Sequence, residues 1–181
     1  TGLGRPFFFI LQDSLRQQRF PDLTGPLCLA LNRVCTASID GLSGGSKGWT
    51  LYRGGSIPSH LLQSFFVPPK QFVCTTYLAT STQKYTAKSF LAGGREGDSK
   101  VLMSFTIPPN SVCRTATKIS YLSAVEGEAE ILFTPGSRFH LTKVDFSGQG
   151  SALAPYHASI SVCTEAVDEE DLVTVPVAPW I

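Results

Sequence analysis

Alternation of apolar and polar side chains is the clearest pattern in the last two thirds of the chain. Between residues 99 and 107, Val101, Met103 and Phe105 alternate with their neighbours at a period of two, which is typical of a β-strand. Residue types and bounding turn residues predict further strands over residues 49–53, 71–81, 128–133, 138–146 and 157–164. We therefore expect this region to consist mainly of short strands.

Helical spacing replaces this alternation in the first third of the chain. Leu27, Leu31 and Val34 follow the i, i+4, i+7 spacing of one helix face. Thr24 is expected to be the N-cap, and Pro26 suits the first turn, where a missing backbone N–H costs nothing. The pattern predicts a helix that begins directly after Thr24.

A second, shorter helix is predicted over residues 84–92, with Ala87, Phe90 and Leu91 on one face. The glycine- and serine-rich residues 41–48 predict a loop between the first helix and the first strand. Helices first and short strands later, without regular alternation of the two, indicate an α+β domain.

Composition narrows the class of protein without changing this prediction. The 181 residues include 12 Phe, only 16% are charged, and the net charge is +1. These values predict one globular domain over residues 1–181, and they argue against a disordered tail and a general nucleic-acid-binding surface. The longest apolar run, Phe7 to Leu11, is far shorter than the roughly 20 residues of a membrane span. Because the chain begins at Thr1 without Met, we expect a processed or excised domain.

Residue spacing indicates neither a metal site nor a serine nucleophile. The five cysteines are scattered without a CxxC pair, and the three histidines lie far from any paired ligand, so no metal site is predicted. Residues 41–45 match G-x-S-x-G, but that motif requires a strand before the serine and a helix after it. A helix is predicted before this serine and a loop after it, so the match is ascribed to chance.

Three segments carry chemically useful groups in a fixed order. Arg53 ends a predicted strand and precedes two glycines, so a guanidinium can bind a phosphate where bare backbone approaches a ligand closely. Residues 77–82 run from an aromatic residue into a cluster of hydroxyl groups. Strand alternation predicts that Glu128 and Glu130 share one face, where two carboxylates require a cationic partner or a function. Taken singly, each segment also fits an ordinary strand end.

In this order the segments resemble the Arg-Ser-Glu class of mono-ADP-ribosyltransferases, a family of clostridial toxins, C3-like exoenzymes and animal ecto-enzymes. Tyr52-Arg53 matches the aromatic-Arg pair of that class, and residues 128–132 match its Glu-x-Glu followed by an aliphatic pair. The resemblance covers roughly residues 24–146. The chain departs from the family pattern at Ala79, which stands where the family has a Ser whose hydroxyl steadies the catalytic Glu.

The resemblance implies a fold, a reaction and a set of site residues. The implied fold is a helical N-terminal part packed on a mixed, mostly antiparallel two-sheet β core. The implied reaction cleaves the bond between nicotinamide and ribose in NAD, the substrate, and passes ADP-ribose to an acceptor. The implied catalytic residues are Glu130, Glu128 and Ser81, and the implied NAD-binding residues are Arg53, Gly54, Thr80 and Phe90.

Each role follows from the same resemblance. Glu130 accepts the ribose 2′-hydroxyl and faces the developing positive charge, while Ser81 supports the strand edge beside it. Arg53 holds the pyrophosphate, and the Gly54 backbone contacts the nicotinamide amide. Phe90 lies against the nicotinamide end, although its place on the helix face also fits a core position.

Glu128 determines the expected acceptor. Family members with Glu two residues before the catalytic Glu usually modify arginine, since a carboxylate can pair with a guanidinium and take its proton. We therefore expect a monomer that modifies an accessible arginine of a target protein, which residues 121–127 would help to present. The resemblance favours a secreted or extracellular location, and a cytoplasmic one stays open.

Three other interpretations also stay open. An NAD glycohydrolase would use water as the acceptor. A catalytically degenerate binding module with the transferase fold is suggested by Ala79. An all-β carbohydrate- or protein-binding domain would make the motifs accidental, and the helical first third argues against it.

Overall fold

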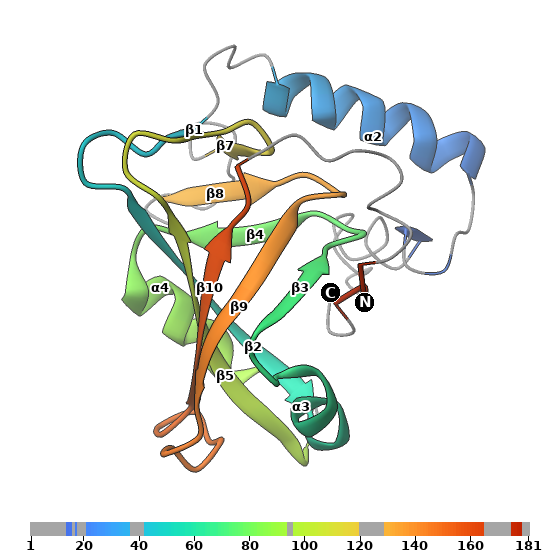
Figure 1. Cartoon of the computed structure of the whole chain (residues 1–181). Helices are drawn as coiled ribbons and strands as arrows, with labels where there is room; N and C mark the ends of the chain where they lie inside the picture. Colours follow the sequence, from blue (N-terminus) through green and yellow to red (C-terminus); the bar gives the residue numbers. More distant parts are fainter. Residues whose placement is uncertain are drawn as a thin grey trace.

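The computed structural model of the chain contains two halves of a β-sheet on a common core, with helices around them (Figure 1). It describes residues 14–15, 17, 21–36, 42–93, 96–119, 129–164 and 175–178. Helices and a mixed sheet together confirm the predicted α+β class. No helix in these ranges is long and apolar enough to cross a membrane.

The larger half of the sheet has the strand order β3–β9–β10–β5–β2. β2 pairs with β5 along its whole length in antiparallel register, whereas β10 lies parallel to β5, so the sheet is mixed. Their alternating apolar residues, such as Leu51 and Phe105, face the core. The strands are β2 (Trp49–Pro58), β3 (Lys70–Val73), β5 (Asp98–Ile107), β9 (Arg138–Asp145) and β10 (Tyr156–Val162).

The smaller half has the strand order β4–β8–β7, with antiparallel pairing throughout. One residue pair, Tyr52 of β2 with Ser81 of β4, connects it to the larger half. The strand pairing between the two halves is therefore limited to this one residue pair. The strands are β4 (Leu78–Ser81), β7 (Ala116–Lys118) and β8 (Glu130–Phe133), and a separate ladder joins β1 (Leu42–Ser43) to β6 (Val112–Cys113).

Phenylalanine rings fill the space between the two halves. The ring of Phe139 in β9 has centroid distances of 5.4 Å to Phe72 in β3 and 5.3 Å to Phe105 in β5. It also contacts Phe133 of β8, at 5.2 Å. These four rings are at most 1% exposed, and burying one such side chain stabilises the fold by about 1.5–3 kcal/mol. Because Phe139 contacts both halves, they share one core.

The helices lie at the ends and along one side of the sheet (Figure 1). α2 lies across the end that carries β7 and β8, where the Tyr77 hydroxyl donates to the Cys28 carbonyl of the helix at 3.1 Å. α4 and the turn η1 lie against β2. The helices are α2 (Pro21–Thr36), α3 (Ser59–Phe65), α4 (Lys84–Ser89) and the 3-10 turn η1 (Phe90–Ala92).

Several predicted elements have different bounds in the structure. The predicted strand over residues 71–81 is wrong, because it forms two strands at separate places in the sheet, β3 and β4. At Cys74, where β3 has ended, the backbone pairs instead with Ser137 and Gly136, at 3.1 and 2.7 Å. The helix predicted to begin after Thr24 begins at Pro21, whose fixed φ suits a first helical position.

Candidate active site

The connection between the two halves of the sheet brings together the segments that the sequence singled out. Tyr52 pairs with Ser81, and Ser81 in turn pairs with Glu130, so the three residues form one row across β2, β4 and β8. Two strand spacings separate the backbones of Tyr52 and Glu130 by roughly 10 Å. Segments from residues 52, 81 and 130 are thus neighbours despite their distance in sequence.

Arg53 directly follows this row and links the two halves through its side chain. Its Nη1 donates to the Ala79 carbonyl of β4 at 2.7 Å, and the side chain is half-buried. Like Leu51, Arg53 is on the core-facing side of β2, so its guanidinium lies between the halves. A hydrogen bond to a fixed carbonyl restricts the plane of the guanidinium and so gives Arg53 a defined orientation.

The two hydroxyl groups predicted in β4 have different surroundings. Ser81 is buried, and its Oγ accepts a hydrogen bond from the Gln83 backbone N–H at 3.0 Å. The Thr80 hydroxyl donates to the Ile131 carbonyl of β8 at 2.9 Å. Thr80 therefore has a structural partner inside the sheet, and its contact with NAD stays a prediction.

The strand predicted over residues 128–133 is wrong at Ala129, which precedes the observed strand. β8 begins at Glu130, and Ala129 has a φ of 46°, in the left-handed region that residues with a Cβ rarely adopt. The Ala129 carbonyl accepts the Thr82 N–H at 3.3 Å, which ties this turn to the end of β4. Strand alternation does not continue through such a residue to Glu128. Glu128 itself and the predicted target-presenting loop, residues 121–127, lie outside the described residues.

Gly54 is required by the close approach of α4. A Cβ at this position would collide with the carbonyl oxygen of Ala87 and lie 3.1 Å from Cγ of Leu91. The prediction that this glycine allows close approach of a ligand is therefore not needed to explain it, because a helix occupies that side of β2. The Gly54 backbone, which is predicted to contact nicotinamide, lies beyond Tyr52 in β2. On the side of β2 where β4 lies, no described strand pairs with β2 beyond Tyr52.

Phe90 lies on η1, at the end of α4, and its side chain is 56% exposed. The alternative that Phe90 belongs to the core is therefore wrong, although Ala87 and Leu91 of the same segment are buried. Phe90 remains available for the predicted contact with nicotinamide.

Three hydrogen bonds that the sequence did not suggest fix the end of this segment. Lys100 Nζ donates to the Gly93 carbonyl at 2.6 Å and to Ser56 Oγ at 2.7 Å, and Ser56 Oγ donates to the same carbonyl at 2.7 Å. We call Ser56, Gly93 and Lys100 the Gly93 clamp. It holds the end of η1 against β2 and β5, and a lysine in an alternating strand gives no sequence signal of that role.

The buried thiol of Cys74 lies close enough to Arg53 to interact electrostatically. Burial raises the pKa of Cys74 far above its usual value, although the positive charge of Arg53 opposes the shift. The thiol stays protonated at neutral pH, so Cys74 cannot be a thiolate nucleophile.

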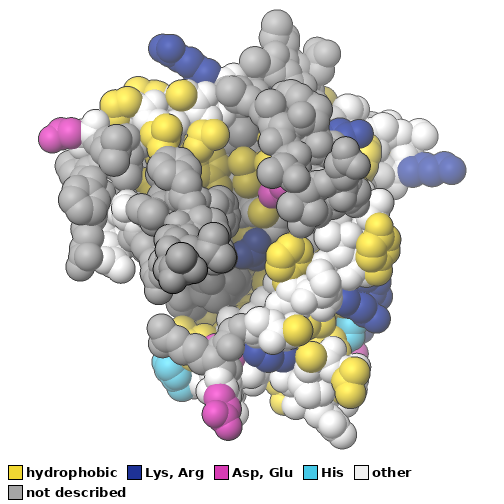
Figure 2. Space-filling view, turned by 180° about the vertical axis from the view of Figure 1, so that it is seen from behind, with side chains coloured by type: hydrophobic (Ala, Val, Ile, Leu, Met, Phe, Trp, Pro, Cys, Tyr) yellow, Lys and Arg dark blue, Asp and Glu magenta, His cyan; other side chains and the backbone are white. Residues whose placement is uncertain are grey.

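Figure 2 shows charged side chains at the rim of one face of the molecule and also nearer its middle, beside residues drawn in grey. Charged groups that are partly surrounded by protein act through a lower dielectric than rim charges and interact more strongly with a ligand.

The described structure is similar to several solved structures of ADP-ribosyltransferases. The Vis toxin of Vibrio splendidus matches 96% of this chain and 73% of its own, with 18% identity and a TM-score of 0.64. Vis bound to an inhibitor gives 19% identity and a TM-score of 0.67, over 97% of this chain and 74% of its own. Plx2a from Paenibacillus larvae matches 84% of this chain and 78% of its own, with 17% identity and a TM-score of 0.55.

The enzymatic component of the Clostridium botulinum C2 toxin is a further similar structure. It matches 90% of this chain but only 41% of its own, with 13% identity and a TM-score of 0.59. The sequence matches no family model and no curated protein. At these identities the likeness shows the fold, and the chain has the ADP-ribosyltransferase fold that its motifs predicted.

Proposed function

We propose that the chain is an NAD-dependent ADP-ribosyltransferase that modifies arginine side chains of a target protein. The observation that carries the proposal is the Tyr52–Ser81–Glu130 row, which places Arg53 and Glu130 beside the same strand, β4. The fold supports the same conclusion, since the chain is similar to solved ADP-ribosyltransferase structures over nearly its whole length.

The chemistry needs an anion beside a developing cation. Cleavage of the bond between nicotinamide and ribose passes through an oxocarbenium-like state, which a fixed negative charge stabilises. Glu130, half-buried at the start of β8, provides this carboxylate and accepts the 2′-hydroxyl of the ribose. Ser81, its neighbour in the ladder, holds the strand edge in place.

The remaining residues bind and orient the substrate NAD. Arg53 binds the pyrophosphate with the guanidinium that its bond to Ala79 already orients. Beyond Tyr52, no strand among the described residues pairs with this edge of β2, and the Gly54 backbone there contacts the nicotinamide amide. Phe90, exposed on η1 and held by the Gly93 clamp, covers the nicotinamide ring. Thr80 supports β4 from inside the sheet.

Arginine is the proposed acceptor because of Glu128. Its carboxylate pairs with a guanidinium and takes the proton that the attacking nitrogen loses. The similar Vis enzyme has been crystallised with agmatine, an arginine analogue, which supports this choice. Since several similar structures are toxins, we include a secreted or extracellular location in the proposal.

An NAD glycohydrolase is the second candidate function. The left-handed backbone of Ala129 removes the strand alternation on which the shared face of Glu128 and Glu130 was predicted. If Glu128 does not face the acceptor, water takes the ADP-ribose instead.

One pair of assays tests the proposal and separates the two candidates. The chain is incubated with NAD, with and without agmatine, while free nicotinamide and ADP-ribosyl-agmatine are measured by mass spectrometry. A transferase forms ADP-ribosyl-agmatine and releases nicotinamide faster with agmatine, whereas a glycohydrolase releases nicotinamide at one rate. No nicotinamide release at all would overturn both and indicate the degenerate binding module.

Glu128→Gln sharpens the arginine assignment. This change should stop agmatine modification but keep slow NAD hydrolysis, because Gln can position a group yet cannot take its proton. Glu96→Gln, at an exposed turn, is the matched control and should change neither assay. Parallel loss of both activities in Glu128→Gln would place Glu128 in the cleavage step.

A further inference from the structure

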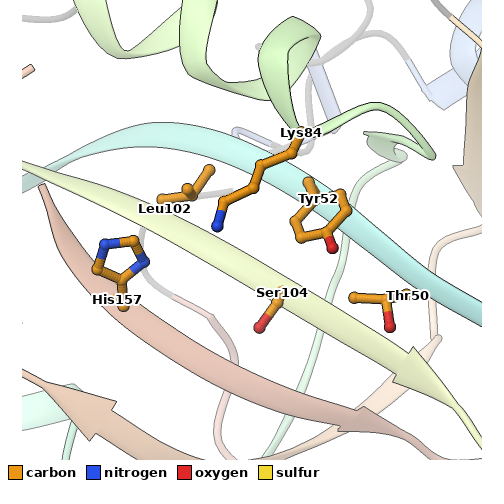
Figure 3. Close-up of a pocket in the computed structure, with 6 residues that line it drawn as sticks. All are labelled: Thr50, Tyr52, Lys84, Leu102, Ser104 and His157. Atoms are coloured by element: carbon orange, nitrogen blue, oxygen red, sulfur yellow. The ribbon is translucent and has the colours of Figure 1, made fainter.

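A shallow depression of about 240 Å³ lies over β2, β5 and β10 beside the start of α4 (Figure 3). None of the residues proposed to bind NAD or to catalyse its cleavage lines the depression, and Arg53 is on the core-facing side of β2 whereas the depression is on the other. Its lining residues are Thr50, Tyr52, Lys84, Leu102, Ser104 and His157.

Strand register gathers this lining on one face of the sheet. Tyr52 pairs with Ser104 between β2 and β5, and Leu102 pairs with His157 between β5 and β10. Cross-strand partners point to the same side of a sheet. Met103, between Leu102 and Ser104, belongs to the core on the opposite side.

The lining contains two basic side chains and no carboxylate. Lys84 extends from the start of α4 across β5, so that its ammonium lies between His157 and Tyr52 (Figure 3). The Lys84 Nζ is 5.9 Å from the centroid of the Tyr52 ring, and within the described ranges no carboxylate pairs with it. Asp145, the cross-strand partner of His157 in β9, interacts with it electrostatically, and the Asp145 Oδ1 accepts the Ser147 N–H at 2.9 Å.

Hydroxyl groups complete the set of hydrogen-bond donors. The hydroxyls of Tyr52 and Thr50 have no hydrogen-bond partner among the described residues. The Ser104 hydroxyl donates to the Ala158 carbonyl at 3.2 Å, so it does not add a donor. Donors from β2, α4 and β10 thus converge from several directions on one open depression.

We propose that this depression binds a phosphate group. A phosphate has several oxygens in a tetrahedral arrangement and up to two negative charges, so it can accept from donors on different sides at once. Lys84 supplies positive charge and N–H donors, His157 supplies a ring N–H donor, and Tyr52 and Thr50 supply hydroxyl donors. A carboxylate, with two oxygens in one plane, would use fewer of these groups.

The phosphate can come from a soluble molecule or from a lipid headgroup. An open depression admits either source. The loop between β9 and β10, which precedes His157, exposes Leu153 at 99% and Phe146 at 47%. Exposed apolar side chains beside a phosphate site are what contact with a lipid surface would use.

The histidine rings allow a direct test with inorganic phosphate. The chain has three histidines, and His60 and His140 do not line the depression. Phosphate is titrated at constant ionic strength, with chloride as the balancing anion, and the ring signals are followed by NMR spectroscopy. We expect a saturable shift of the His157 signals alone, identified through loss of those signals in His157→Gln.

Lys84→Gln is the test variant, and Lys88→Gln, which removes the same charge from the same helix outside the lining, is its control. Lys84→Gln should weaken phosphate binding about three- to tenfold, as expected for one partly exposed charged partner, while Lys88→Gln should bind like the wild type. Unsaturable or uniform histidine shifts, or equal effects of the two variants, would overturn the proposal.

Vesicles distinguish the two sources of phosphate. Co-sedimentation compares phosphatidic acid vesicles with phosphatidylcholine vesicles, using wild type and Lys84→Gln. Binding of inorganic phosphate together with Lys84-dependent binding to phosphatidic acid would assign a lipid headgroup. Binding of inorganic phosphate alone would assign a soluble ligand. Vesicle binding without phosphate binding would overturn the proposal, because the loop between β9 and β10 would then make the contact with the lipid surface.

Discussion

The two halves of the sheet are held together by different interactions. In the larger half, β2 and β5 pair along ten-residue strands, and the buried rings of Phe72, Phe105 and Phe139 lie on its strands. In the smaller half, β4 and β8 have four residues each and connect to β2 through one pair, yet they carry Ser81 and Glu130. Apolar burial thus stabilises the scaffold, while a few hydrogen bonds at a junction position the site.

A substitution in the core that both halves share should have the largest effect on the free energy of unfolding. Phe139→Ala should lower the free energy of unfolding by about 3–5 kcal/mol, because Phe139 contacts rings of both halves. Leu132→Ala, in the smaller cluster beneath α2, should cost nearer 2 kcal/mol. Denaturant unfolding followed by circular dichroism measures both. Equal losses, or two separate transitions, would show that the halves do not share one core.

Substitution of Gly54 tests whether the position of α4 against β2 affects stability and NAD binding. In Gly54→Ala the added methyl group collides with the Ala87 carbonyl, which should cost about 1–3 kcal/mol of stability and shift α4 together with Phe90. Gly55→Ala is the matched control, since its Cβ would meet only the flexible end of Met103, at 3.3 Å. Unfolding curves and NAD titrations are compared for both. If both variants behave alike, the approach of α4 is not what requires glycine.

Arg53→Lys separates substrate binding from folding. Lysine keeps the charge but cannot bind a diphosphate through two parallel N–H groups, so NAD affinity should fall about tenfold. Stability should change little, because Arg53 is only half-buried. Calorimetric NAD titration gives the dissociation constant, and an unchanged value would remove Arg53 from the site.

Removing part of the Gly93 clamp is expected to have the smallest effect of these changes, and the effect should be on KM for NAD. Lys100→Met removes two hydrogen bonds to Gly93 and Ser56 and should raise KM for NAD about threefold, with little change in kcat. The Ser56 bond to Gly93 remains, which limits the loss. Lys100→Arg should restore most of the wild-type KM. A change in kcat alone would mean that the clamp does not position the nicotinamide side of the site.

The larger half was predictable because its strands are long and alternate clearly. β5 has the predicted apolar face, with Val101, Met103, Phe105 and Ile107 buried. β1, β6 and β7 have two or three residues and show no periodicity, so nothing in the sequence marks them. The break between β3 and β4 arises because the Cys74 backbone pairs with residues 136 and 137. These residues are far from Cys74 in the sequence, so a local sequence pattern cannot predict the break.

The segments of the candidate site could be identified from the sequence as an ordered set of motifs, but their geometry could not. The motif order located Arg53, Ser81 and Glu130, and the ladder brings their segments together. The left-handed Ala129 could not be foreseen, because alternation assumes extended backbone and alanine is no signal of its absence. The Gly93 clamp depends on a lysine from a distant strand, so its role appears only in the folded chain.

Glu130→Gln tests the central claim most directly, because the proposed function assigns the catalytic carboxylate to Glu130. This change should lower the rate of nicotinamide release at least about a hundredfold, as the loss of one electrostatic stabiliser typically does. NAD affinity should stay nearly unchanged, since Arg53 and the edge of β2 still bind the substrate. The measurement is nicotinamide release under saturating NAD, with the dissociation constant determined on the same preparation. A rate above one tenth of the wild-type value would contradict the account.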